Sequence, residues 1–195
     1  GGSLEYSELG CTHHCPEDVA ILKKLPNIDI FIPGNDYELE TLIKQNKSNL
    51  PSYTRLSKHS HNMNIKIKNG KANCLQEEKK SKTLVIVIGP ALRFIEKNLI
   101  NLKVSILYYS TIRPFDYKVL NKFKHVNKII LVHEMYVGSL VSDISLNFNK
   151  FVKIFDLGLP LKFFDNYGSE QDQYDGIGLN AKKIVKKIKK LIELK

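Results

Sequence analysis

The sequence has few cysteines and no long apolar run, and both absences exclude classes of protein. No stretch of the 195 residues approaches the roughly 18 consecutive apolar residues that span a bilayer. The first residues, GGSLEYSELG, contain neither a basic nor an apolar segment, so we expect no secretory signal. The three cysteines, Cys11, Cys15 and Cys74, are too few and too odd in number for a disulfide framework, which predicts a reducing, cytoplasmic setting.

Acidic residues are also in the minority, and the formal net charge is +10. A basic surface can attract nucleic acid or anionic lipid. The lysines, however, are spread along the chain and form no motif with aromatic residues, so we expect no nucleic acid and no membrane as partner. The sequence begins without Met, which we interpret as a fragment or a processed chain.

Apolar runs recur along the chain and predict strands that alternate with helices. The clearest is TLVIVIG (83–89), a continuous run typical of a buried parallel strand. Further strands are expected in IDIFIPG (28–34), SYTRLS (52–57), KVSILYY (103–109), KIILVHE (128–134) and FVKIFDLG (151–158). Helices are expected near 16–25, 35–46, 91–101, 137–148 and 180–194, with a short one in IRPFDYKVLNKF. The alternation predicts an α/β fold with a mostly parallel sheet.

Two of these helices have clear signals at their start. Asn35 and Glu38 form a capping pair, and Asn180 opens the last helix. Glu134, at a strand end, is also interpreted as satisfying a helix start. In the helix at 35–46 we expect the inward residues to be Leu39, Leu42 and Ile43. In the last helix, the apolar face consists of Ile184, Ile188, Leu191 and Ile192. Lysines occupy the rest of that helix, so we expect it to dock on the fold with a basic face toward solvent.

A polar, Lys-rich segment separates two regions of this rhythm. We interpret residues 61–82 as a linker between a first domain, 1–60, and a second, 83–195. Within the linker, Asn69-Gly70 could close a hairpin, and a small antiparallel strand could follow.

The densest group of reactive residues is GCTHHCPED (10–18), and three interpretations compete. A structural zinc site from Cys11, Cys15 and a histidine would need a second pair of ligands, which the sequence does not offer at the usual spacing. A cysteine nucleophile would need a triad geometry, which adjacency in sequence does not provide. The third interpretation is a polar loop at a helix start whose histidines face a ligand. Histidine titrates near neutrality and can donate to or accept from a substrate hydroxyl.

These residues, taken in order, resemble the C-terminal section of the transketolase family. GCTHHCPEDVAILKKLPNIDIFIPGNDYELETLI and PSYTRLSK resemble the end of that family's pyrimidine-binding domain. TLVIVIG, STIRPFD, VHEMYVGSLVSDI and GSEQDQYDGIGLNAKKIVKKI resemble its C-terminal domain. The resemblance covers essentially the whole chain. It implies a partial pyrimidine-binding α/β domain followed by a three-layer α/β/α domain with a mostly parallel sheet.

The resemblance also implies roles for individual residues. His13 matches the histidine of the family's Gly-x-Thr-His segment, which contacts the substrate near the reacting carbon, and His14 adjoins it as a substrate-binding residue. Lys58 stands where the family has an arginine that grips the sugar phosphate, and Arg55 lies three residues earlier. Lysine supplies the charge but not the planar two-pronged contact of arginine. Leu9 replaces an aspartate that touches substrate hydroxyls in many members, which puts the substrate in doubt.

The residues that hold the family's cofactor, thiamine diphosphate with Mg, lie upstream of the matching region. The chain contains no Gly-Asp-Gly metal motif, so no cofactor-binding or metal-binding residue is assigned here. The resemblance therefore implies part of an enzyme that moves two-carbon ketol units between sugar phosphates, inactive without its upstream half. Its expected partners are a second copy, or a chain that carries the diphosphate-binding half.

Three alternatives remain open at this stage. A 1-deoxyxylulose-5-phosphate synthase and the β subunit of a 2-oxoacid dehydrogenase share this architecture, and Lys58 favours a phosphate-bearing substrate over a plain 2-oxoacid. A non-catalytic basic module that dimerises or binds polyanions is the alternative of another class.

Overall fold

The computed structural model describes residues 1–148 and 151–194, and its larger sheet has five strands. The strand order is β3-β5-β4-β7-β8. Four strands are parallel, namely β4 (Thr83–Ile88), β5 (Ser105–Tyr109), β7 (Lys128–Val132) and β8 (Lys153–Asp156). The edge strand β3 (Asn73–Gln76) pairs antiparallel with β5. The predicted α/β fold with a mostly parallel sheet is confirmed.

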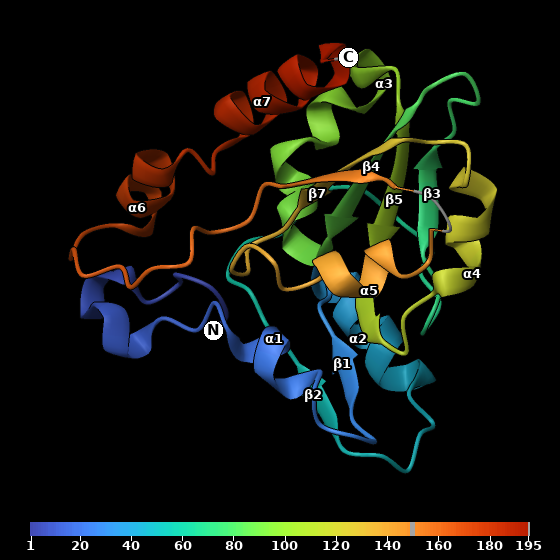
Figure 1. The fold of residues 1–195 in the computed structure, drawn as a ribbon. Coiled ribbons are helices and arrows are strands. Elements are labelled where there is room, and N and C mark those ends of the chain that lie inside the picture. The colour runs from blue at the N-terminus through green and yellow to red at the C-terminus, as the bar shows by residue number, and fades with distance from the viewer. Residues whose placement is uncertain (149–150, 195) are drawn as a thin grey trace.

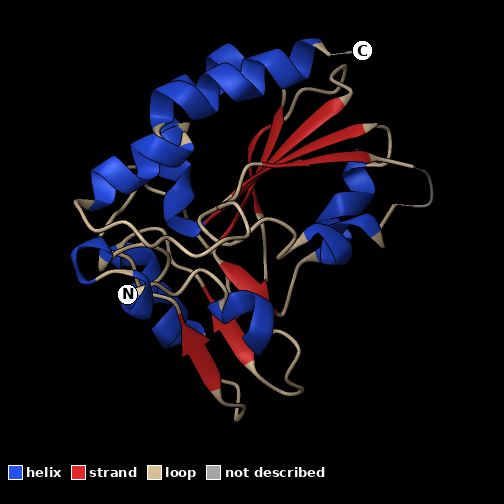
Figure 2. Cartoon of the chain, turned by 60° about the vertical axis from the view of Figure 1, so that its left-hand side comes forward, coloured by secondary structure: helices blue, strands red, loops and turns tan. Residues whose placement is uncertain are grey.

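Helices cover both faces of this sheet, so the layers are α/β/α (Figure 2). Side chains alternate between the faces of a strand. Val85 and Val87 therefore pack toward α7 (Ala181–Glu193) and α3 (Leu99–Leu102), whereas Leu84 and Ile86 pack toward α4 (Tyr117–Leu120) and α5 (Val141–Ser145). β4 is fully buried because it lies inside both layers, as its apolar run predicts.

A second, smaller sheet lies below the first in Figure 1. Its central strand β1 (Asp29–Phe31) runs parallel to β2 (Ser52–Thr54) and antiparallel to β6 (Thr111–Arg113). The helices α1 (Asp18–Leu22) and α2 (Asp36–Gln45) belong to the same part of the chain. β6 follows β5 in sequence, so this sheet joins chain from both sides of the expected linker. The domain boundaries themselves stay a prediction.

A buried polar cluster ties the expected linker to both sheets. His61 in that segment faces Glu38 of α2, with 3.1 Å between Nε2 and Oε1, and Tyr108 of β5 donates its hydroxyl to Glu38 Oε2 at 2.5 Å. The backbone N–H of Met63 donates to His61 Nδ1, so Nε2 bears the proton and donates to the carboxylate. All three side chains are buried, as are Ile65 and Ile67 farther along. The segment is therefore part of the core.

The two helix starts marked by asparagine in the sequence are confirmed. The Asn35 side chain accepts from the backbone N–H of Glu38 at 3.0 Å, and that of Asn180 accepts from Lys183 at 2.8 Å. In α7 the apolar face packs on the core as predicted, since Ile184 and Ile188 are buried and Leu191 and Ile192 partly so. In α2, Leu42 is buried but Ile43 is 64% exposed, so its predicted inward position is wrong.

Other local predictions need correction. Residues 91–101 do not form one helix: 3-10 helices span Gly89–Phe94 and Glu96–Asn98 before α3, because the backbone leaves the helical region at Ile95 and Asn98. The helix predicted at 137–148 is only α5, since Gly138 adopts φ +90° and forms a turn first. Asn69 and Gly70 form a turn but no hairpin, because the strand that follows, β3, pairs with β5.

The segment after β8 carries the polar helix α6 (Glu170–Ile177), whose first turn is capped by the Ser169 hydroxyl. Among residues 1–148 and 151–194, no helix combines the length and the apolar character needed to cross a membrane.

Candidate functional site

The predicted site residues lie on an exposed turn near the N-terminus. Cys11–His13 form a single 3-10 turn, and His14 is extended after it. Gly10 precedes the turn with φ +77°, a conformation that favours glycine, and a side chain there would meet the ring of Tyr167. Cys11, Thr12 and His13 are exposed to solvent. We refer to residues 10–15 as the His13 turn; it is open to a ligand or to another chain.

The His13 turn is attached to the fold at its C-terminal end. Ser3 and Cys15 form an antiparallel bridge, with backbone N–H to O distances of 3.2 and 2.9 Å. Arg55 donates to the Cys15 carbonyl at 3.2 Å. The Oγ1 of Thr12 and the Nδ1 of His13 lie 3.0 Å apart, so the neighbouring hydroxyl orients the imidazole. The turn thus presents His13 from a fixed base.

Arg55, predicted to bind substrate, is buried and faces inward. Its side chain is only 6% exposed, and its Nε lies 3.3 Å from the Asp18 carboxylate. The same guanidinium donates to the carbonyl of Glu134 at 3.1 Å, beyond the end of β7. These contacts join the His13 turn, the start of α1 and the five-stranded sheet. They favour a positioning role for Arg55, and direct contact with a substrate stays a prediction.

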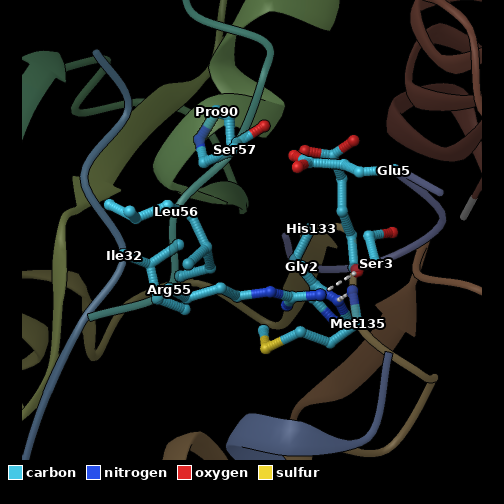
Figure 3. Close-up of a pocket in the computed structure, with 12 residues that line it drawn as sticks. Gly2, Ser3, Glu5, Ile32, Arg55, Leu56, Ser57, Pro90, His133 and Met135 are labelled. Carbon is cyan, nitrogen blue, oxygen red and sulfur yellow. Dashed lines mark hydrogen bonds between the residues drawn. The ribbon is translucent and has the colours of Figure 1, made fainter. Parts of the chain in front are cut away.

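A small cavity adjoins Arg55, and Figure 3 shows the Arg55 side chain extended across it. Its lining includes Gly2, Glu5, Pro90 and Met135. The volume of about 10 Å³ corresponds to roughly one water-sized sphere, so it does not admit a sugar phosphate. A substrate would have to meet the chain at the exposed surface of the His13 turn instead.

His14 is half-buried behind this surface. Its ring meets Phe164 edge to face, with centroids 6.3 Å apart. Burial lowers the pKa of His14, so the imidazole is neutral at pH 7. In the described part of the chain neither ring nitrogen has a hydrogen-bond partner. Buried polar atoms rarely lack a partner, so His14 has unused capacity to bind a polar group.

Lys58, the predicted anion-binding residue, is exposed and rests on the N-terminal segment. Its Nζ donates to the Glu5 carbonyl at 2.9 Å and lies 4.4 Å from the centre of the Tyr6 ring. The next residue, His59, pairs with Glu170 of α6 at 2.9 Å. Lys58 and His13 thus both lean on one N-terminal segment, but within the described residues they make no direct contact.

The cysteines do not behave as activated thiols. Burial, followed by the nearby carboxylates of Asp18 and Glu17, raises the pKa of Cys15, so its thiol is protonated near neutrality. Cys11 is exposed and free. Across residues 1–148 and 151–194, no three His, Cys, Asp or Glu side chains are grouped so as to hold a metal ion.

An ion pair beneath the turn has no counterpart among the sequence predictions. Arg93 donates to both carboxylate oxygens of Glu134 at 2.7 and 2.6 Å. Burial alone would raise the pKa of Glu134, but the Arg93 charge and hydrogen bonds outweigh it and leave that pKa lowered. The predicted role of Glu134 at a helix start is wrong, because α5 begins only at Val141. Arg93 and Glu134 are 41 positions apart, so no local pattern could have paired them.

The fold and the exposed His13 turn define a class: the chain is a transketolase-like C-terminal section. No family model matches the sequence. A solved structure described as a split-gene transketolase, an inactive β4 tetramer, superposes with a TM-score of 0.81 at 20% identity, over 95% of this chain and 65% of that chain. The resemblance of the sequence to the transketolase family is confirmed.

Curated relatives give the same class at low identity. An uncharacterized 33.6 kDa protein of the fasciation locus of Rhodococcoides fascians is 26% identical over 193 residues, covering 94% of this chain and 60% of its own length. One subunit of the apulose-4-phosphate transketolase of Actinobacillus succinogenes is 27% identical, covering 71% and 49%. The 1-deoxy-D-xylulose-5-phosphate synthase of Malacoplasma penetrans is 29% identical, covering 72% and 24%. The chain thus spans between a quarter and three-fifths of the length of these relatives.

Proposed function

We propose that the chain is the C-terminal section of a thiamine-diphosphate-dependent enzyme that transfers two-carbon ketol units between sugar phosphates. The observation that carries the proposal is the exposed His13 turn, held at the carboxyl edge of the five-stranded sheet by Arg55. The similarity to a single transketolase subunit and to a split-gene transketolase supports a partner chain that carries the other half. A second copy of the same chain is also proposed as a neighbour, and the free thiols fit a reducing cytoplasm.

Each site residue has a distinct part in this proposal. His13 offers a solvent-facing imidazole that donates to or accepts from a substrate oxygen near the reacting carbon. His14 lies behind it and, being neutral, can accept a hydrogen bond from a ligand. Lys58 attracts the sugar phosphate as a point charge, and Arg55 keeps the turn in place.

Thiamine diphosphate supplies the carbanion chemistry of this class when it is bound. The described residues include no metal-holding group, so we assign this chain to the substrate side of the site and the diphosphate to its partner. The exposure of the His13 turn fits this division, because the turn is accessible to another chain.

Two other functions are separated by observations already made. A 1-deoxyxylulose-5-phosphate synthase section has comparable similarity to the sequence, and it would join pyruvate to glyceraldehyde phosphate instead of moving a ketol unit. A 2-oxoacid dehydrogenase β subunit has less support, since Lys58 favours a phosphorylated substrate. A non-catalytic basic module would bind DNA with a strong dependence on salt.

The decisive experiment reconstitutes the enzyme. The chain is mixed with the protein that carries the upstream half, together with thiamine diphosphate and Mg, and ketol transfer between sugar phosphates is measured. Activity that requires both chains supports the proposal. Synthase activity with pyruvate would support the second function, and salt-dependent DNA binding without either activity would support the basic module.

Substitutions then test the site in the reconstituted enzyme. We expect His13→Ala to lower kcat by at least about tenfold, since it removes a contact made near the reacting carbon. Lys58→Ala should mainly raise KM for the sugar phosphate, by about tenfold, because it removes one charge-assisted contact. Glu8→Ala and Lys66→Ala, both exposed, are the matched controls and should leave both constants unchanged. Unchanged kinetics in the first two variants would refute the assignment.

A further inference from the structure

The amino-terminal edge of the five-stranded sheet carries a recess of about 600 Å³, a volume typical of small-molecule sites. Four lysines line it, namely Lys82, Lys103, Lys128 and Lys153. The rest of the lining consists of Ser81, Thr83, Asn127, Phe151, Ile192 and Leu194. None of these described lining residues is acidic, and we call the recess the lysine basin.

The sheet topology brings these lysines together. Parallel strands all begin at the same edge, and Lys82 and Lys103 lie just before β4 and β5. Lys128 begins β7 and Lys153 begins β8, and the two are register partners on neighbouring strands. Like charges directly opposite each other on adjacent strands repel and destabilise the sheet. The fold therefore holds positive charge here at a cost in stability.

Lys128 is the one lysine of the four that is used internally. It is buried, and its Nζ donates to the carbonyls of Leu191 at 2.6 Å and Leu194 at 2.5 Å. These carbonyls belong to the end of α7, whose partial negative charge a cation compensates. Burial and then the charge of Lys153 lower the pKa of Lys128. The negative end of α7 is thus already neutralised.

The other three lysines are available to a ligand. Lys82, Lys103 and Lys153 are exposed, and within residues 1–148 and 151–194 their ammonium groups make no hydrogen bond or ion pair. The acid nearest in the surrounding elements, Glu193 of α7, is exposed and does not line the recess. The basin therefore has several positive charges around a concave surface and no internal counterion.

We propose that the lysine basin binds the phosphate or diphosphate group of a small molecule through Lys82, Lys103 and Lys153. An ammonium group binds phosphate oxygens as a point charge, and three around one recess suit an anion with two or more charges. An anion there would also relieve the repulsion between Lys128 and Lys153. The basin is a second site, because it lies at the amino ends of the strands beside the end of α7, whereas the His13 turn lies at their carboxyl ends (Figure 1).

Calorimetric titration of the full chain with inorganic pyrophosphate, and separately with inorganic phosphate, tests the proposal. The basin variant combines Lys82→Gln, Lys103→Gln and Lys153→Gln. The control variant removes the same charge from exposed lysines elsewhere, with Lys24→Gln, Lys66→Gln and Lys186→Gln. We expect pyrophosphate to bind the wild-type and control chains alike, and the basin variant at least about tenfold more weakly. Equal loss in both variants, or no binding to the wild type, would overturn the proposal.

A footprint on the wild-type chain keeps the test valid if the basin variant does not fold. Lysine acylation is followed by mass spectrometry with and without pyrophosphate. Lys82, Lys103 and Lys153 should become slower to react, while Lys24 and Lys66 react as before. Equal protection of all five would show diffuse screening by the anion and would refute the basin. Neither readout depends on ketol transfer, so both are independent of the proposed function.

Discussion

Removal of one hydroxyl from the buried Glu38, His61 and Tyr108 cluster should destabilise the protein measurably. Tyr108 is fully buried, and its hydroxyl donates to Glu38 Oε2 at 2.5 Å. Burial, and then the nearby carboxylate, raise the pKa of Tyr108 far above its ordinary value, so the phenol stays protonated and donates throughout the usual pH range. In Tyr108→Phe the carboxylate keeps only the donors from Gly34, at 2.8 Å, and His61, at 3.1 Å.

The size of the effect follows from the burial of the acceptor. Hydrogen bonds to charged groups contribute about 1.5–3 kcal/mol, and a buried acceptor that loses a donor cannot recruit water. Glu38 has no exposed surface, so we expect Tyr108→Phe to lower the free energy of unfolding by about 2–3 kcal/mol. The neighbouring Tyr109 provides the control, since it is equally buried but donates to a neutral carbonyl, that of Asp116, at 3.1 Å. Tyr109→Phe should cost about 1 kcal/mol.

Urea denaturation followed by circular dichroism measures both variants. The denaturant dependence of the free energy should be the same in all three proteins, so that midpoints report stability alone. If Tyr109→Phe costs as much as Tyr108→Phe, the carboxylate gives no added strength to the bond, and our account of the cluster is wrong.

Two further predictions concern α6 and a close backbone contact. The pKa of His59 is raised mainly by its hydrogen bond to Glu170, so the pair stabilises the fold below the ordinary histidine pKa of about 6.5 and ceases to do so as pH rises through the raised value. His59→Asn should therefore lose some tenths of a kcal/mol at pH 6, with the side chain part-exposed, and nothing at pH 9, in parallel urea titrations; an equal loss at both pH values would contradict the ion pair. Gly158→Ala places Cβ against the ring of His133, closer than van der Waals contact allows, and should destabilise by about 1–3 kcal/mol. Gly176→Ala in α6 meets nothing within 4 Å and should stabilise by about 0.5–1 kcal/mol; the same sign in both thermal melts would be inconsistent with this packing.

Local signals in the sequence were sufficient for much of the fold. The apolar run at 83–89 indicated a strand because both faces of β4 are covered. Asn35 and Asn180 marked helix starts because an N-cap depends on residues within one turn. The errors arose where tertiary context decides. Ile43 has the right spacing for the inward face of α2, but no neighbouring element covers it there.

The candidate site was only partly predictable for a related reason. The exposed position of His13 follows from a local turn after Gly10, and that part was accessible to sequence reasoning. The burial of Arg55 was not, because its partners come from three separate segments that include Asp18 and Glu134. A charged residue in a sequence gives no sign of whether its counterion is a ligand or another part of the chain. Arg55 is the instance here where the two differ.

The position of β1 between β2 and β6 bears on how the chain responds to cleavage. β2 and β6 come from opposite sides of residues 61–82, and β1 forms backbone hydrogen bonds with both. A protease that nicks this segment would cut one covalent connection and leave the sheet intact, so the fragments should migrate together under native conditions. Expressed apart, the N-terminal fragment would present an unpaired edge of β1, which favours aggregation.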